Sequence, residues 1–161
     1  MTTIPSDQAG AVEPRPIIPA LTRFYAFARD ASYPLIRATV GGTLLVHGIG
    51  KLMGPPIAAF AQQSIAKRGI EPAMLVAYIV FINETIGAAC VILGLFTRFF
   101  AASIAIEIAV ITFLVFLPHG YGATRPSGGW EYPLLWGLLF FAVALRGGGP
   151  YSLDRKIGWE L

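Results

Sequence analysis

The chain has 161 residues and a formal net charge of +3, and its composition is far more apolar than that of a soluble domain of this length. Hydrophobic residues make up 55% of it and charged residues 13%, whereas soluble domains carry about a quarter charged residues. Because a domain of this size buries only about two-thirds of its surface, the excess predicts a small integral membrane protein and excludes a soluble enzyme, a disordered chain and a coiled coil. The single cysteine, Cys90, excludes an intramolecular disulfide and cysteine-rich metal centres.

The N-terminal region precedes the first long apolar run. Residues 1–19 form a polar, proline-rich tail without an apolar core, which is not the pattern of a cleavable signal peptide. Over residues 20–34, apolar side chains recur at helical spacing between arginines, which predicts a short amphipathic segment in the membrane interface, ended by Pro34. The alternative is a structured juxtamembrane linker.

Residues 35–146 contain the apolar segments of a four-span membrane domain. The predicted spans are Leu35–Met53, Ala73–Phe96, Phe99–Leu117 and Tyr132–Leu145. The fourth is free of charge for only 14 residues, fewer than the roughly 20 usually needed, so it spans only if Trp130 and Glu131 join its first turn or the bilayer thins. The loop Pro55–Pro72 is long enough for a short helix.

The distribution of basic residues predicts the orientation. Eight of the twelve lysines and arginines lie on the side that carries the N-terminal region, the turn between the second and third spans, and the C-terminal tail of residues 147–161. By the positive-inside rule, that side is cytoplasmic. The predicted fold class is therefore all-α, a transmembrane up-down four-helix bundle with both termini cytoplasmic. Because the basic residues are scattered, no nucleic-acid partner is predicted.

Four ionisable side chains lie inside the predicted spans, where they are costly and usually face the bundle interior: His47, Lys51, Glu84 and Glu107. At about 1.5 Å of rise per residue, Lys51 and Glu84 lie at one depth, roughly 21 Å from the cytoplasmic boundary. His47 and Glu107 lie at another, roughly 13–15 Å. These depths predict a Lys51–Glu84 pair and a hydrogen bond between His47 and Glu107. The alternatives are that Lys51 extends to the outer water and that the carboxyl groups are protonated and only fix the helix register.

The sequence predicts no catalytic residues and no metal site. It contains no Ser–His–Asp arrangement, phosphate-binding loop or HExxH motif, and Cys90 is interpreted as a small buried hydrophobic residue. An activity of the chain on its own is therefore not expected.

Four motifs resemble the DoxX family of small bacterial membrane proteins. They are GIGKLMG at 48–54, NETIGAACVILGLFTRFFA at 83–101, GWEYPLL at 129–135 and GGGPYSLD at 147–154. The resemblance covers about residues 37–154 and implies a four-helix, multi-pass protein of the bacterial inner membrane. It maps the family's motif positions onto Gly48, Lys51, Glu84, Arg98, Glu131, Ser152 and Asp154.

The resemblance also implies a functional hypothesis, because relatives occur in quinone-linked oxidoreductase assemblies. The first hypothesis is an accessory subunit that docks a redox partner and shapes access to a quinone. The expected partners are the lipid bilayer and other membrane or membrane-associated redox proteins; a quinone is a candidate cofactor, and no covalently bound cofactor is expected. The alternative is a small proton-coupled carrier that uses Glu84 and Glu107. An enzyme that acts alone is disfavoured by the missing cofactor motifs.

Overall fold

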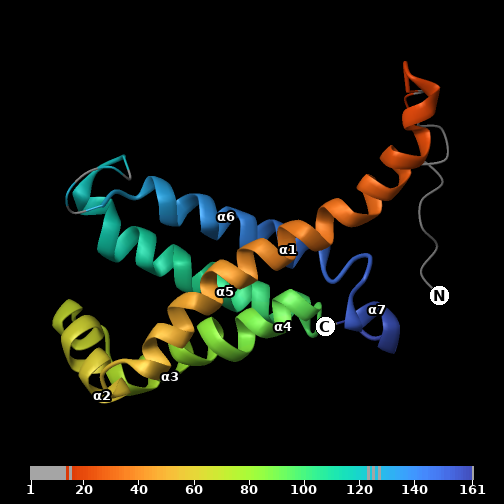
Figure 1. The fold of residues 1–161 in the computed structure, drawn as a ribbon. Helices are drawn as coiled ribbons and strands as arrows, with labels where there is room; N and C mark the ends of the chain where they lie inside the picture. The colour runs from red at the N-terminus through yellow and green to blue at the C-terminus, as the bar shows by residue number, and fades with distance from the viewer. Residues whose placement is uncertain (1–13, 15, 123, 125, 127, 161) are drawn as a thin grey trace.

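The computed structural model describes residues 14, 16–122, 124, 126 and 128–160, and every regular element within them is helical (Figure 1). The helices are η2 (Pro19–Leu21), α1 (Thr22–Met53), α2 (Ile57–Phe60), η3 (Ala61–Ile65), η4 (Ala66–Arg68), α3 (Ala73–Ile82), η5 (Asn83–Gly87), α4 (Ala88–Leu93), α5 (Thr97–Ile111), η6 (Thr112–Phe116), η7 (Leu117–His119), α6 (Glu131–Arg146) and α7 (Leu153–Ile157). Most of the predicted N-terminal tail, residues 1–13 and 15, lies outside the described residues.

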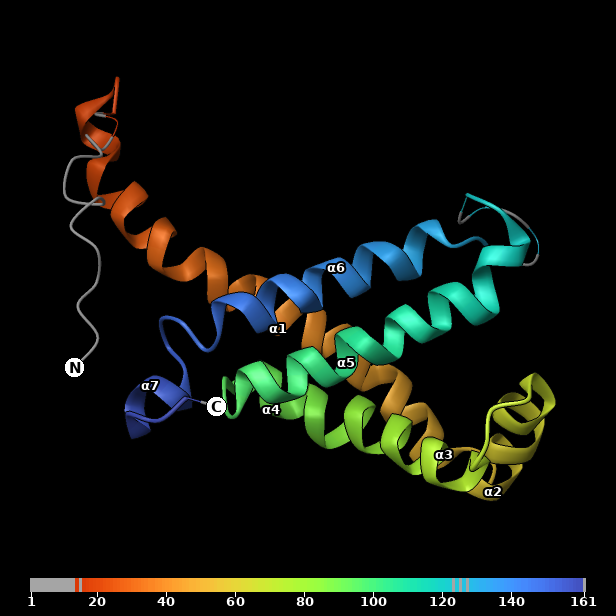
Figure 2. The ribbon, with the colours of Figure 1, turned by 180° about the vertical axis from the view of Figure 1, so that it is seen from behind.

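The first helix is longer than predicted. The expected helix end at Pro34 is wrong, because α1 runs without interruption from Thr22 to Met53 with Pro34 inside it. A proline removes one backbone hydrogen bond, but the bonds on either side continue the helix. At about 1.5 Å per residue, 32 residues exceed the roughly 30 Å of a bilayer core. The N-terminal part of α1 accordingly projects beyond the other helices in both views (Figures 1 and 2). The interfacial location of residues 20–34 stays a prediction.

The short helix predicted in the loop after α1 is confirmed. The chain turns by 110° after Met53, and a helical segment runs over Ile57–Arg68. This segment packs against the start of α3 through a small apolar cluster of Ala61, Ile65, Ala73 and Ala77. The outer loop is therefore a folded part of the protein that covers one end of α3.

Within the described residues, two continuous helices have the length and apolar composition of membrane spans. They are Ala73–Leu93, made of α3, η5 and α4, and Thr97–His119, made of α5, η6 and η7. A third span is counted if α1 and the bent segment after it are one unit. Helix α6 has 16 residues; Glu131 lies in its first turn, as expected for a short fourth span, whereas Trp130 is its N-cap.

The helices pack in pairs around an apolar core. Helix α5 runs along α6, and α1 packs against α4 and η5. The core side chains come from α1, α4, α5 and α6 and include Val40, Val91, Ile104, Phe140 and Val143. Many large apolar side chains face outward on the same helices. An apolar exterior around a packed core is typical of helices that contact lipid.

Candidate functional site

The first two long helices meet at a glycine. Gly48 is buried on α1, and a Cβ atom there would collide with the backbone carbonyl of Glu84. Glycine at this position therefore lets α1 pack directly against η5. The η5 segment is π-helical, a distortion that is frequent at functional sites. It carries Asn83 and Glu84, which are 4% and 5% exposed.

An ion pair joins these two helices. The Nζ atom of Lys51 donates to Oε2 of Glu84, which confirms the pairing predicted from helix depth. The Lys51 side chain is 23% exposed and the Glu84 side chain 7%, so the carboxylate is the more buried partner. The Lys51 ammonium also lies 5.1 Å from the centre of the Phe60 ring, a cation–π contact with the outer helical segment.

A second carboxyl group extends these contacts to α5. The Nδ2 atom of Asn83 donates to Oε2 of Glu107 at 2.9 Å, and Oγ of Ser103 donates to Oδ1 of Asn83 at 3.0 Å. Glu84 and Glu107 line the same cavity. We call Lys51, Asn83, Glu84, Ser103 and Glu107 the polar cluster. It links α1, η5 and α5 through side chains alone.

The predicted hydrogen bond between His47 and Glu107 is wrong. His47 is exposed, and Asn83 takes the place that was expected for the imidazole. The reason is the arrangement of the helices beside one another. Both α1 and α5 pack against η5, so η5 supplies the polar group that reaches Glu107. Depth along the helices was a correct guide for one pair and a misleading one for the other, because depth does not say which side of a helix faces its neighbour.

His47 instead lines a cavity between α1, α5 and α6. This cavity, the His47 cavity, has a volume of about 560 Å³, and the other residues with polar side chains that line it are Thr43, Glu84, Tyr132 and Trp136. The remaining lining residues are mostly apolar and include Phe116 and Phe140. The Nε1 atom of Trp136 is buried and has no acceptor among the described residues. A buried indole N–H normally has a partner, so Trp136 brings an unsatisfied donor to a residue that lines the cavity.

A second cavity lies on the other side of η5. This Lys51 cavity, of about 460 Å³, opens between α3, α5 and the outer helical segment, and all members of the polar cluster line it. Arg68 contributes a further charge at its edge. Glu84 lines both cavities.

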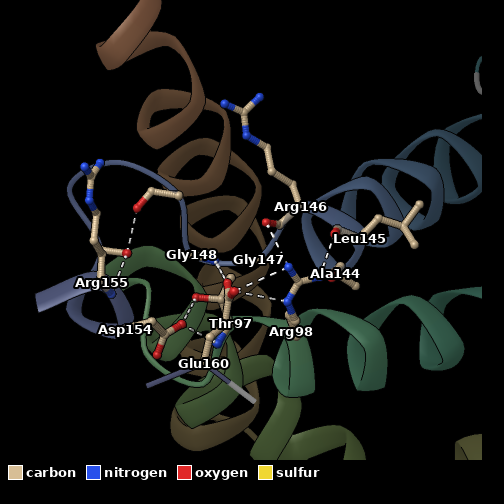
Figure 3. Close-up of polar contacts among 12 residues, drawn as sticks. Thr97, Arg98, Ala144, Leu145, Arg146, Gly147, Gly148, Asp154, Arg155 and Glu160 are labelled. Atoms are coloured by element: carbon tan, nitrogen blue, oxygen red, sulfur yellow. Dashed lines mark hydrogen bonds and ion pairs between the residues drawn. The ribbon is translucent and has the colours of Figure 1, made fainter. Parts of the chain in front are cut away.

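The motif residues near the C-terminus meet at the opposite end of the helices (Figure 3). The carboxylate of Asp154 accepts hydrogen bonds from the backbone N–H groups of Phe96 and Thr97, at 2.7 and 3.0 Å, and from Oγ1 of Thr97 at 2.6 Å. Asp154 therefore caps the N-terminus of α5 from a distant segment. Arg98 donates to the carbonyls of Ala144 and Leu145 at 3.2 and 2.6 Å, which caps the end of α6.

Two further residues hold the C-terminal segment in place. Oγ of Ser152 accepts from the backbone N–H of Arg155 at 3.1 Å and caps α7. Arg37, only 2% exposed, donates to the carbonyls of Gly148 and Tyr151. The motif residues Arg98, Ser152 and Asp154 thus join helix ends, a structural arrangement separate from both cavities.

Several residues of these sites were not singled out from the sequence. Asn83 and Ser103 carried a usable signal, because they are polar residues inside apolar runs. Arg37 was not singled out either, although it is the buried anchor of the C-terminal segment. Trp136 carried no signal, since only the structure shows that its N–H lacks an acceptor.

The motif residue Glu131 lies apart from the polar cluster, at the first turn of α6. A hydrogen bond with its carboxylate, together with its negative charge, raises the pKa of the Tyr121 hydroxyl in the preceding loop. The described residues contain no group of three or more side chains that could hold a metal ion.

Comparison with known proteins identifies the family. The DoxX family model matches residues 33–117, just over half of the chain. An uncharacterized protein of Haemophilus influenzae (strain ATCC 51907 / DSM 11121 / KW20 / Rd) is 30% identical over 122 residues, which cover 75% of this chain and 87% of the relative. No solved structure matches significantly. The matched region includes Gly48, the polar cluster and Arg98, and the chain belongs to the DoxX family.

Proposed function

We propose that this protein is an accessory subunit of a quinone-linked redox complex in the bacterial inner membrane, where it docks a redox partner and provides a quinone site in the His47 cavity. The observation that carries the proposal is the unpartnered indole N–H of Trp136 in an aromatic-walled cavity next to a carboxyl group. Apolar pockets with a few convergent polar groups are the usual form of small-molecule sites.

The chemistry of a quinone ring fits this cavity. The ring is flat and apolar and stacks against aromatic side chains, and its carbonyl oxygens accept hydrogen bonds. Trp136 supplies a donor, and the His47 imidazole supplies another. Glu84 places a carboxyl group at the same cavity, where a quinone that gains electrons needs protons.

The proposal includes a topology of four spans with both termini in the cytoplasm. Helix α6 would be the fourth span, at about 24 Å for its 16 residues, which requires the bilayer to thin locally. This topology leaves the projecting part of α1 and the C-terminal segment on the cytoplasmic side, where the redox partner would bind.

The Trp136→Phe variant tests the quinone site. The wild-type protein, purified in mild detergent, is expected to retain quinone that solvent extraction and chromatography can quantify. Loss of one hydrogen bond of about 1–1.5 kcal/mol should weaken binding of a short-chain benzoquinone roughly tenfold. The control is Trp159→Phe, whose indole is 81% exposed at the C-terminus and should leave binding unchanged. Equal binding by all three proteins, or none by the wild type, contradicts the quinone site.

The polar cluster favours a second candidate, a proton-coupled carrier that uses Glu84 and Glu107. Two adjacent carboxyl groups with a lysine counter-charge are typical of proton-linked transport. If this is the function, liposomes that contain the wild-type protein should show a flux driven by a pH gradient, measured with an internal pH-sensitive dye. Glu84→Gln and Glu107→Gln should each abolish it without loss of the fold, with Glu71→Gln in the outer loop as the control. Wild-type liposomes that are no leakier than protein-free ones exclude the carrier.

A further inference from the structure

Glu107 has an incomplete set of hydrogen bonds. Its residue is 9% exposed, and one carboxyl oxygen, Oε2, accepts from Asn83 at 2.9 Å. The other oxygen, Oε1, is fully buried and has no hydrogen-bond donor among the described residues. An oxygen of a buried carboxylate without a donor loses its hydration without compensation, which costs several kcal/mol in an apolar interior.

The neighbour of Glu107 is a second carboxyl group and not a donor. Glu84 lines the same cavity as Glu107, and its Oε2 atom is bound to Lys51. An ionised carboxylate only accepts hydrogen bonds, so an ionised Glu84 offers the buried Oε1 atom of Glu107 no donor. The negative charge of one carboxylate also disfavours ionisation of the other.

The surrounding charges lead to the same result. If both carboxyl groups were ionised, two negative charges would face the single positive charge of Lys51, for a net charge of −1 in the membrane interior. Arg68 is exposed and its guanidinium donates to the carbonyl of Ser64, and His47 is exposed in the other cavity. One proton on the pair leaves Lys51 and one carboxylate, a neutral cluster.

We propose that Glu84 and Glu107 form a proton-binding site that holds one proton, carried by Oε1 of Glu107 and donated to Glu84. In this state the buried Oε1 atom of Glu107, which otherwise lacks a partner, carries the proton. Lys51 pairs with an ionised Glu84, and a neutral Glu107 donates to Glu84 and accepts from Asn83. The site goes beyond the proposed quinone role and does not depend on it. Because Glu84 lines both cavities, it connects the stored proton to the His47 cavity.

Infrared spectroscopy of the full-length protein in detergent tests the proton site. At neutral pH, the wild type should show the carbonyl stretch of one protonated carboxylic acid per chain, at a frequency above the carboxylate bands. Glu107→Gln should remove this band. This substitution also keeps the hydrogen bonds of a neutral Glu107, because its amide nitrogen can donate to Glu84 and its amide oxygen can accept from Asn83. The control, Glu71→Gln, removes an exposed carboxylate of the outer loop and should leave the band unchanged.

A second measurement applies if Glu107→Gln fails to fold. Wild-type protein labelled with ¹³C at the glutamate carboxyl groups should show the same band displaced to lower frequency, with an intensity of one carboxyl group per chain. A band that does not move, a band with the intensity of two groups, or no band at all overturns the proposal. A band that persists in folded Glu107→Gln overturns it as well.

Discussion

The Asp154→Ala variant is expected to lose about 3–5 kcal/mol of stability, one of the two largest effects of a single substitution in this protein. The Asp154 side chain accepts three hydrogen bonds, two of them from backbone N–H groups at the start of α5. Thr97 is fully buried, so water cannot replace the lost acceptor. The midpoint of thermal unfolding in detergent, followed by circular dichroism, should fall by roughly 10 °C.

Two matched variants separate the capping role from the loss of a negative charge. Asp154→Asn keeps one acceptor oxygen, so it should show an intermediate loss of stability. Glu160→Gln removes a carboxylate from the same C-terminal segment, and this one is partly exposed in its ion pair with Arg98. Exposed pairs contribute at most about 1 kcal/mol, so this control should remain close to the wild type. If Asp154→Ala and Glu160→Gln unfold at the same temperature, Asp154 does not stabilise the fold by capping α5.

The positions of the helices could be predicted from the sequence because their signals are local. Apolar runs ended by glycine and charged residues gave spans close to the observed Ala73–Leu93 and Thr97–His119. The end of α1 was also predicted, but its start was not. Pro34 suggested a helix end on local grounds, whereas the helix bonds on both sides of it continue α1 to Thr22.

The polar cluster was predictable only in part, because helical rise fixes the depth of a residue but not the direction in which it faces. Depth alone paired Lys51 with Glu84 correctly. It paired His47 with Glu107 wrongly, since Asn83 on the intervening turn reaches Glu107 first. Which helices are neighbours depends on close packing at Gly48, and this is a property of the tertiary structure.

The motif residues near the C-terminus could be recognised but not explained from the sequence. Thr97 and Asp154 are 57 positions apart, and nothing local shows that one caps the helix of the other. Arg98 likewise binds the end of α6, a helix that is distant in the sequence. Ser152 caps α7 in the C-terminal segment, whose position depends on the folded structure. The structure thereby divides the family's motif positions into a group that caps helices and a group, including Lys51 and Glu84, that forms the polar cluster.

The second large effect is expected when the ion pair in the polar cluster is broken from one side only. Lys51→Met leaves Glu84 as a buried carboxylate without its cation, and such unpaired charges typically cost about 3–5 kcal/mol. Glu84→Gln should cost less, because the Lys51 side chain is 23% exposed and its ammonium can extend toward the outer water.

The double variant Lys51→Met/Glu84→Gln distinguishes a specific ion pair from general damage to the core. With both charges removed, no buried charge is left unpaired, and most of the stability lost in Lys51→Met should return. Unfolding of all four proteins by a denaturing detergent gives the coupling energy between the side chains. Losses that simply add in the double variant would mean that Lys51 and Glu84 contribute independently and that their contact does not stabilise the helix pair.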